Sequence, residues 1–236
     1  MLKKEYLARS PIRILEKSTR GGLGKGNLGV FTSRKGVGKT GSLVHVALDS
    51  MLRGEQVLHV SFNENPNHIL GWYEIVYKEL KKTYKLHNIG IDYDEIKRNR
   101  IVMNFNQDKI SVPDVKKSID AMAEHGNFVP SLIIVDGFKF FQAQNSDFDA
   151  FKSIAQAKDV EMWFSATLHR DHMDLDEKGI PAPVNKFTDY FSIIIMLDPQ
   201  KDYIDLKLLK DNGSTDLEKL RLKLNPQTLL IANRRV

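Results

Sequence analysis

The chain of 236 residues contains no cysteine, and this absence excludes both a disulfide framework and a metal site built on thiolates. A long apolar run is also missing. The longest one, around Ile193–Leu197, is far shorter than the roughly 20 residues that a membrane-spanning helix needs. The first residues, Met1–Tyr6, lack the apolar core of a signal peptide. We therefore expect a cytoplasmic protein with no membrane span.

Acidic residues are scarce in the first 40 residues, which hold ten Lys or Arg against Glu5 and Glu16. A basic segment of this kind can meet nucleic acid, an acidic lipid surface or an acidic partner. Net charge alone is weak evidence for nucleic-acid binding, and we interpret residues 1–20 as a solvated basic arm. Hydrophobic residues make up 42% of the chain, which fits one globular domain over residues 1–236.

Strand and helix patterns alternate over the first two-thirds of the chain. Short apolar runs predict strands, and apolar positions at helical spacing predict helices between them. The expected strands are 28–32, 56–62, 101–105, 132–136 and 161–168, and the expected helices are 39–53, 65–86, 112–125 and 148–157. Strands that are apolar throughout indicate a parallel sheet covered by helices on both faces, an α/β fold. The C-terminal part instead predicts antiparallel hairpins at the sheet edge, with strands at 192–197, 203–209 and 229–232.

A glycine-rich segment stands between the first expected strand and the first expected helix. It matches the phosphate-binding pattern G-x-x-x-x-G-K-[ST] at Gly38-Lys39-Thr40, while Ser33 takes the place of the first glycine. Small residues let consecutive backbone N–H groups turn toward an anion, and the N-terminus of the following helix favours negative charge. Lys39 is expected to reach the β- and γ-phosphates of a nucleotide, and the Thr40 hydroxyl to bind Mg²⁺. The candidate nucleotide-binding residues are Ser33, Arg34, Lys35, Gly36, Val37, Gly38, Lys39, Thr40 and Gly41.

An acidic residue, Asp136, ends the apolar run Leu132–Asp136 about 100 residues after this loop. An aspartate at such a position is the natural Walker B acid, which holds Mg²⁺ beside the phosphates. We therefore expect Thr40 and Asp136 to form the metal site.

Five segments, taken in order, resemble the RecA-like ATPases, and specifically their KaiC/RadA branch. Gly21–Leu28 resembles the branch's GGLPKGS, Gly54–Pro66 resembles GEKVLYISFEESP, and Leu132–Asp136 matches LIIVD. Thr188–Ile194 resembles LADVVI, and Leu206–Asn212 resembles LRVLKNR. The order and spacing agree over most of the chain.

This resemblance implies a RecA-like core, ATP with Mg²⁺ as the ligand, and homo-oligomeric rings or filaments with the nucleotide at subunit interfaces. In such assemblies a basic residue of the neighbouring subunit completes the site, and Lys210 is the matching residue here. Asp211-Asn212 replaces a continuation where a second basic residue often stands, which puts efficient activation across the interface in doubt.

The chain departs from the family at the catalytic carboxylate. The family carries this group in the pair after the second strand, where it orients and deprotonates the attacking water, and the pair is Asn63-Glu64 here. An asparagine can position water but cannot accept its proton. Either Glu64 takes over the role, or turnover is very slow. His169, just after the strand 161–168, is a candidate γ-phosphate sensor or an ordinary loop histidine.

Three functions stay open at this point. The chain is an ATPase acting in a homo-oligomer, a nucleotide-binding regulator or scaffold with a degenerate site, or an ATP-dependent DNA-binding protein of recombination or replication. DNA binding has the weakest support, because the loop 170–187 holds four acidic residues against three basic ones. Arg34–Thr40 also resembles the KGGVGKT loop of ParA/MinD partition ATPases, but Ser61–Glu64 stands where those proteins place an acidic DxD segment.

Overall fold

The computed structural model describes residues 3–62, 65–85, 92–168, 174–214, 217 and 219–234. In this part of the chain, nine strands form one sheet: β1 (Leu28–Ser33), β2 (Val57–Ser61), β3 (Arg100–Asn104), β4 (Leu132–Asp136), β5 (Glu161–Thr167), β6 (Phe191–Pro199), β7 (Ile204–Asp211), β8 (Leu222–Leu224) and β9 (Ile231–Asn233). Their order is β3-β2-β4-β5-β1-β6-β7-β8-β9. The pairings from β3 to β6 are parallel, and those from β6 to β9 are antiparallel. This arrangement confirms the predicted α/β class, with hairpins at the C-terminal edge.

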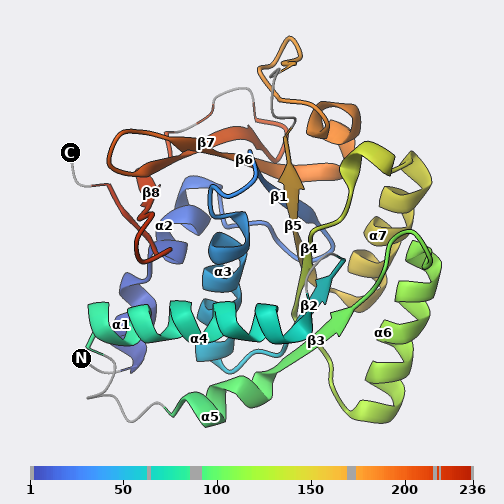
Figure 1. The fold of residues 1–236 in the computed structure, drawn as a ribbon, viewed down its shortest axis with the longest axis horizontal. Helices are drawn as coiled ribbons and strands as arrows, with labels where there is room; N and C mark the ends of the chain where they lie inside the picture. The colour runs from blue at the N-terminus through green and yellow to red at the C-terminus, as the bar shows by residue number, and fades with distance from the viewer. Residues whose placement is uncertain are drawn as a thin grey trace.

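Helices cover both faces of the sheet (Figure 1). One face packs against α1 (Lys3–Arg9), α2 (Pro11–Ser18), α3 (Lys39–Arg53), α4 (Pro66–Thr83) and α5 (Tyr93–Ile96). The other face packs against α6 (Val112–Gly126), α7 (Asn145–Lys158) and the 3₁₀ turn η4 (Val184–Tyr190). Two shorter 3₁₀ turns are η2 (Lys97–Asn99) and η3 (Phe140–Gln142). Every residue of β1, β2 and β4 is buried, as expected for strands covered on both sides.

Capping residues explain where the main helices begin and end. α3 is bounded by Gly38 and Gly54, both in the left-handed backbone region that suits glycine. Asn65 precedes α4, and its side chain accepts a hydrogen bond from the N–H of Asn67. Ser111 and Asp114 form a capping box at the start of α6. None of the described helices is long and apolar enough to cross a membrane.

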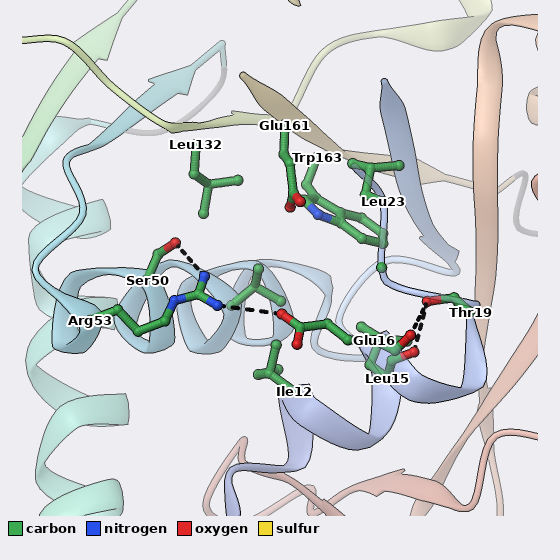
Figure 2. Close-up of a pocket in the computed structure, with 12 residues that line it drawn as sticks. Ile12, Leu15, Glu16, Thr19, Leu23, Ser50, Arg53, Leu132, Glu161 and Trp163 are labelled. Carbon is green, nitrogen blue, oxygen red and sulfur yellow. Dashed lines mark hydrogen bonds and ion pairs between the residues drawn. The ribbon is translucent and has the colours of Figure 1, made fainter. Parts of the chain in front are cut away.

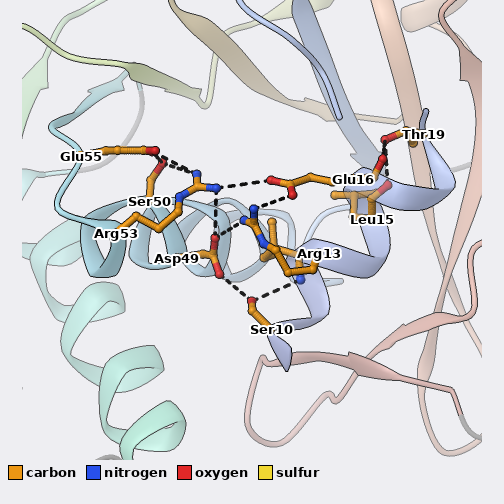
Figure 3. Close-up of polar contacts among 10 residues, drawn as sticks. Ser10, Arg13, Leu15, Glu16, Thr19, Asp49, Ser50, Arg53 and Glu55 are labelled. Carbon is orange, nitrogen blue, oxygen red and sulfur yellow. Dashed lines mark hydrogen bonds and ion pairs between the residues drawn. The ribbon is translucent and has the colours of Figure 1, made fainter. Parts of the chain in front are cut away.

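The interpretation of residues 1–20 as a solvated arm is wrong. Ile12 and Leu15, one helical turn apart on α2, are buried against the core. Arg13 and Ser10 both donate hydrogen bonds to the carboxylate of Asp49 on α3, which is fully buried (Figure 3). Part of the positive charge in this segment therefore neutralises an acid of the chain itself.

A small cavity lies between α2, α3 and the strands beneath them (Figure 2). Arg53 crosses it and donates hydrogen bonds to Ser50 and Glu16, and Trp163 of β5 lines its far wall. Its volume of about 20 Å³ is enough for one water molecule, so the cavity is a packing gap and not a ligand pocket.

Candidate nucleotide-binding site

The glycine-rich segment that the sequence predicts to bind phosphate, here called the phosphate loop, runs from the end of β1 to the start of α3. β1 lies between β5 and β6 in the interior of the sheet, which holds the entrance of the loop rigid. Ser33 is the last residue of β1, so the serine that replaces glycine takes extended backbone and needs no glycine freedom. The turn is made instead by Gly36 and Gly38, with φ of 84° and 115°.

Backbone N–H groups are available at the centre of this loop. Those of Gly36, Val37 and Gly38 donate no hydrogen bond to any other residue that the structure describes. Arg34, Lys35 and Gly36 are exposed at the tip of the loop. Free donors at a helix N-terminus form the kind of cradle that binds phosphate.

Lys39, the first residue of α3, reaches back over the loop. Its ammonium donates to the carbonyl oxygens of Ser33 and Arg34, at 3.0 and 2.9 Å, and to the Ser33 hydroxyl at 3.3 Å. The side chain is almost fully buried. Burial lowers the pKa of Lys39 to about 8, and the nearby Asp136 carboxylate opposes this shift. The ammonium therefore lies in a place that favours a new anionic partner.

Thr40 and Asp136 meet across the end of β5. The Thr40 hydroxyl donates to one carboxylate oxygen of Asp136 at 2.8 Å, although 96 residues separate them in the chain. The other carboxylate oxygen accepts a hydrogen bond from Ser165 of β5, whose hydroxyl in turn accepts from the N–H of Gly137 at 3.0 Å. Ser165 thus orients the acid. No motif in the sequence points to Ser165, because one serine inside an apolar strand has no pattern of its own.

These residues fit Mg²⁺ bound together with phosphate. A hydroxyl and a carboxylate are oxygen ligands of the type that Mg²⁺ prefers. Within the described residues, no cluster of three or more His, Asp or Glu side chains could hold a metal by itself. Mg²⁺ typically binds one or two carboxylates together with substrate phosphates, and the pair of Thr40 and Asp136 suits that arrangement.

Of the four predicted catalytic residues, the structure describes only Lys210. Asn63, Glu64 and His169 lie outside the described residues. Lys210 lies on β7, and its ammonium donates to the carbonyl of Thr188 in η4 at 2.7 Å. Burial lowers the pKa of Lys210, and Asp189 opposes the shift.

No protein-family model and no curated protein matches this chain.

Proposed function

We propose that the chain is a Mg-ATP-binding protein of the RecA/KaiC type that works in a homo-oligomeric assembly. The observation that carries this proposal is the contact of Thr40 with Asp136, 2.8 Å apart, beside the desolvated ammonium of Lys39. A hydroxyl, a carboxylate and an ammonium from three separate positions converge on a glycine turn with free N–H groups. A lysine-rich surface turn without a binding function would not be expected to contact a buried acid such as Asp136, which lies 96 residues from Thr40 in the chain.

Each residue has a definite task in this proposal. The N–H groups of residues 36–38 bind phosphate oxygens, and Lys39 exchanges its carbonyl partners for the terminal phosphates. Thr40 and Asp136 would hold Mg²⁺, which would supply positive charge that neutralises the phosphate oxygens. Ser165 keeps Asp136 in position through a hydrogen bond.

The RecA/KaiC assignment has two supports. The five resembling segments of the sequence are the first. The second is the position of Lys210, whose ammonium contacts η4 on one face of the sheet while α3 and the loop cover the other face. A lysine on this face is better placed to contact a nucleotide bound to a neighbouring subunit than one bound to the loop of its own subunit.

Hydrolysis is slow in this proposal. Asn63 cannot accept the proton of an attacking water, so Glu64 is the only member of the pair that can act as a base. The alternative is a regulator or scaffold that binds nucleotide without turnover, and the asparagine is the feature that favours it.

Equilibrium binding of Mg-ATP tests the central claim. Lys39→Ala should raise the Kd at least about a hundredfold, since a charge-assisted hydrogen bond to phosphate contributes about 3 kcal/mol. Asp136→Asn should remove most of the gain in affinity that Mg²⁺ provides. The matched control is Lys25→Ala, which removes an exposed lysine paired with Asp159 and should leave the Kd unchanged. Equal affinity of wild type and Lys39→Ala would show that the loop is not the binding site.

Steady-state turnover separates the ATPase from the regulator. A slow rate that Glu64→Gln abolishes supports the ATPase with Glu64 as its base. No detectable phosphate release from a protein that binds Mg-ATP tightly supports the regulator or scaffold.

A further inference from the structure

A cavity of about 600 Å³ lies at the edge of the sheet, between α4 and the segment that runs from α5 to β3. α5 and the start of β3 lie along one side of α4, and β3 is the last strand on this side of the sheet (Figure 1). The volume is within the range of about 300–1,000 Å³ that is usual for small-molecule sites. Seven residues from four elements line it: Leu70, Glu74, Tyr77, Tyr93, Asp94, Lys97 and Arg100.

This cavity is separate from the phosphate loop. Arg100 is the first residue of β3 and lies in register with Val57 of β2, which in turn pairs with Leu132 at the start of β4. Asp136 is at the other end of β4, about 13 Å further along at roughly 3.3 Å per residue. The cavity therefore lies at the amino ends of the strands, whereas the loop follows a carboxyl end. A ligand of this cavity would be independent of the proposed nucleotide.

Arg100 has a guanidinium group without a counter-charge. Its Cζ atom lies 4.2 Å from the ring centroid of Tyr73, and the Tyr73 hydroxyl is 3.1 Å from Nδ1 of His59. Tyr73 and His59 are both fully buried, so the arginine rests on a rigid base. Among the residues that the structure describes, no acid forms an ion pair with Arg100, and its buried Nη1 atom has no hydrogen-bond partner. A ring face stabilises the charge but accepts none of the N–H donors in the plane of the guanidinium, so an anionic group would be a better partner.

Glu74, on the α4 wall of the cavity, is also without a partner. It forms no ion pair or hydrogen bond within the described part of the chain. Asp94 and Lys97 neutralise each other, with 2.5 Å between their charged atoms. The cavity is thus left with one unpaired carboxylate, on Glu74, and one unpaired cation, on Arg100. A ligand of either net charge would be repelled by one of the two groups, whereas a zwitterion complements both.

The rest of the wall is largely apolar. The rings of Tyr77 and Tyr93 stack with centroids 4.6 Å apart, and Leu70 lies one helical turn before the carboxylate on α4. Asp92 accepts a hydrogen bond from the N–H of Asp94, which fixes the start of the segment that carries Tyr93. Two tyrosine rings and a leucine suit a ligand that also has an apolar or aromatic group.

We propose that the cavity between α4 and β3 binds a free amino acid with an apolar or aromatic side chain. Arg100 binds its carboxylate and Glu74 binds its ammonium group. Leu70 and the rings of Tyr77 and Tyr93 contact its side chain. Because the two charges stand on different walls, the site selects the zwitterion over an amine or an acid of similar shape.

Calorimetry with L-phenylalanine and L-leucine tests the site. Two analogues, L-phenylalanine amide and 3-phenylpropionate, lack the carboxylate and the ammonium group, respectively. Wild type should bind L-phenylalanine at least about tenfold more tightly than either analogue, since each analogue leaves one charged residue of the site unpaired. Arg100→Gln should raise the Kd of L-phenylalanine at least about tenfold and change that of the amide less than about twofold. Glu74→Gln should weaken L-phenylalanine similarly, without weakening 3-phenylpropionate.

Matched control variants are available in the same segment. Arg98→Gln and Glu95→Gln each neutralise an exposed residue that does not line the cavity, and both should bind L-phenylalanine as wild type does. A melting curve for each variant shows whether it is folded. Glu74 is exposed on α4, so Glu74→Gln decides the question if Arg100→Gln fails to fold.

Three results would overturn the inference. The first is the absence of saturable binding of both amino acids at about 10 mM. The second is an equal Kd of L-phenylalanine in wild type and in the folded cavity variants. The third is displacement of the amino acid by Mg-ATP, which would place it at the phosphate loop. Failure of the proposed function has a different signature, because unchanged Mg-ATP binding in Lys39→Ala would leave the binding of L-phenylalanine unaffected.

Discussion

Lys39 carries its charge in a place where its partners are neutral oxygens of its own loop. The desolvation that this placement costs is the main reason for its lowered pKa. Asp136, whose negative charge opposes this shift, already uses one oxygen for Thr40 and the other for Ser165. The loop is thus built so that a phosphate group would be a better partner for the ammonium than any group now beside it.

Binding of Mg-ATP should therefore be coupled to proton uptake by Lys39. The free protein holds this proton below pH 8 and loses it as the pH rises through about 8, whereas a phosphate partner raises the pKa. Because the ligand binds the ammonium form, affinity should fall above pH 8, by up to about tenfold per pH unit. Calorimetry at pH 8.5, in two buffers of different ionisation enthalpy, should show uptake of roughly 0.75 proton per site.

The variant Lys39→Arg supplies the control for this prediction. An arginine stays charged throughout the range, so whatever affinity remains should show no proton uptake at pH 8.5. Tight binding by wild type with no uptake at this pH would mean that Lys39 is not desolvated in the free protein.

At the scale of elements, hydrogen bonds to the buried carboxylate of Asp49 hold the N-terminal helices against α3. Asp49 is fully buried and accepts hydrogen bonds from Arg13 and Ser10, with Arg53 3.8 Å away (Figure 3). A buried carboxylate is stable only while it is paired, so the attachment depends on these partners. The segment is part of the core and not an appendage.

Arg13→Ala should lower the free energy of unfolding by about 2–3 kcal/mol, because it leaves the buried Asp49 without its closest cation. The control is Arg9→Ala, an exposed arginine of the same segment, which should cost less than about 0.5 kcal/mol. Urea unfolding followed by circular dichroism measures both. Equal stabilities of the two variants would place α2 away from Asp49 in solution.

Periodicity predicted the elements that are long and regular. α3 runs over the predicted residues 39–53, and β4 over the predicted 132–136, because an apolar pattern and a clear boundary coincide in each. α1 and α2 escaped prediction, since their basic residues mask a short apolar repeat of Ile12 and Leu15. β8 has only three residues, Leu222–Leu224, too few for any periodicity to be visible.

For the candidate site, too, the sequence marks only the residues that lie in local patterns. A local motif marks Lys39 and Thr40, and an apolar strand marks Asp136. The contact of Leu224 and Leu229 with the loop joins segments almost 190 residues apart and depends on how the sheet edge curls over α3. No local pattern in the sequence records such a contact.

At the scale of the whole molecule, the sheet separates two groups that the proposed activity needs together. α3 and its lysine cover one face, and the ammonium of Lys210 lies on the other, against η4. Phe187 of η4 packs on Phe148 of α7 with ring centroids 4.5 Å apart, so η4 belongs firmly to that second face. In this fold one copy therefore does not bring Lys210 to its own Lys39, and the proposed assembly would instead place Lys210 at the loop of a neighbouring copy.

Mixing two defective variants tests this arrangement. Lys39→Ala lacks the phosphate lysine, and Lys210→Ala lacks the residue for the neighbour's site, so each alone should hydrolyse ATP far more slowly than wild type. In a head-to-tail ring, an interface between the intact loop of one variant and the intact Lys210 of the other is complete. Random assembly of equal amounts makes about a quarter of the interfaces complete, so about a quarter of wild-type turnover should return.

The control mixture combines the single variant Lys39→Ala with a double variant that carries both Lys39→Ala and Lys210→Ala. Neither component has an intact loop, so this mixture should stay inactive at every ratio. Light scattering on the same samples, with and without Mg-ATP, shows whether the subunits assemble. Full turnover by Lys210→Ala alone would remove Lys210 from the site. Assembled mixtures that recover no turnover would refute the head-to-tail arrangement, because they would show that Lys210 of one subunit does not complete the site of its neighbour.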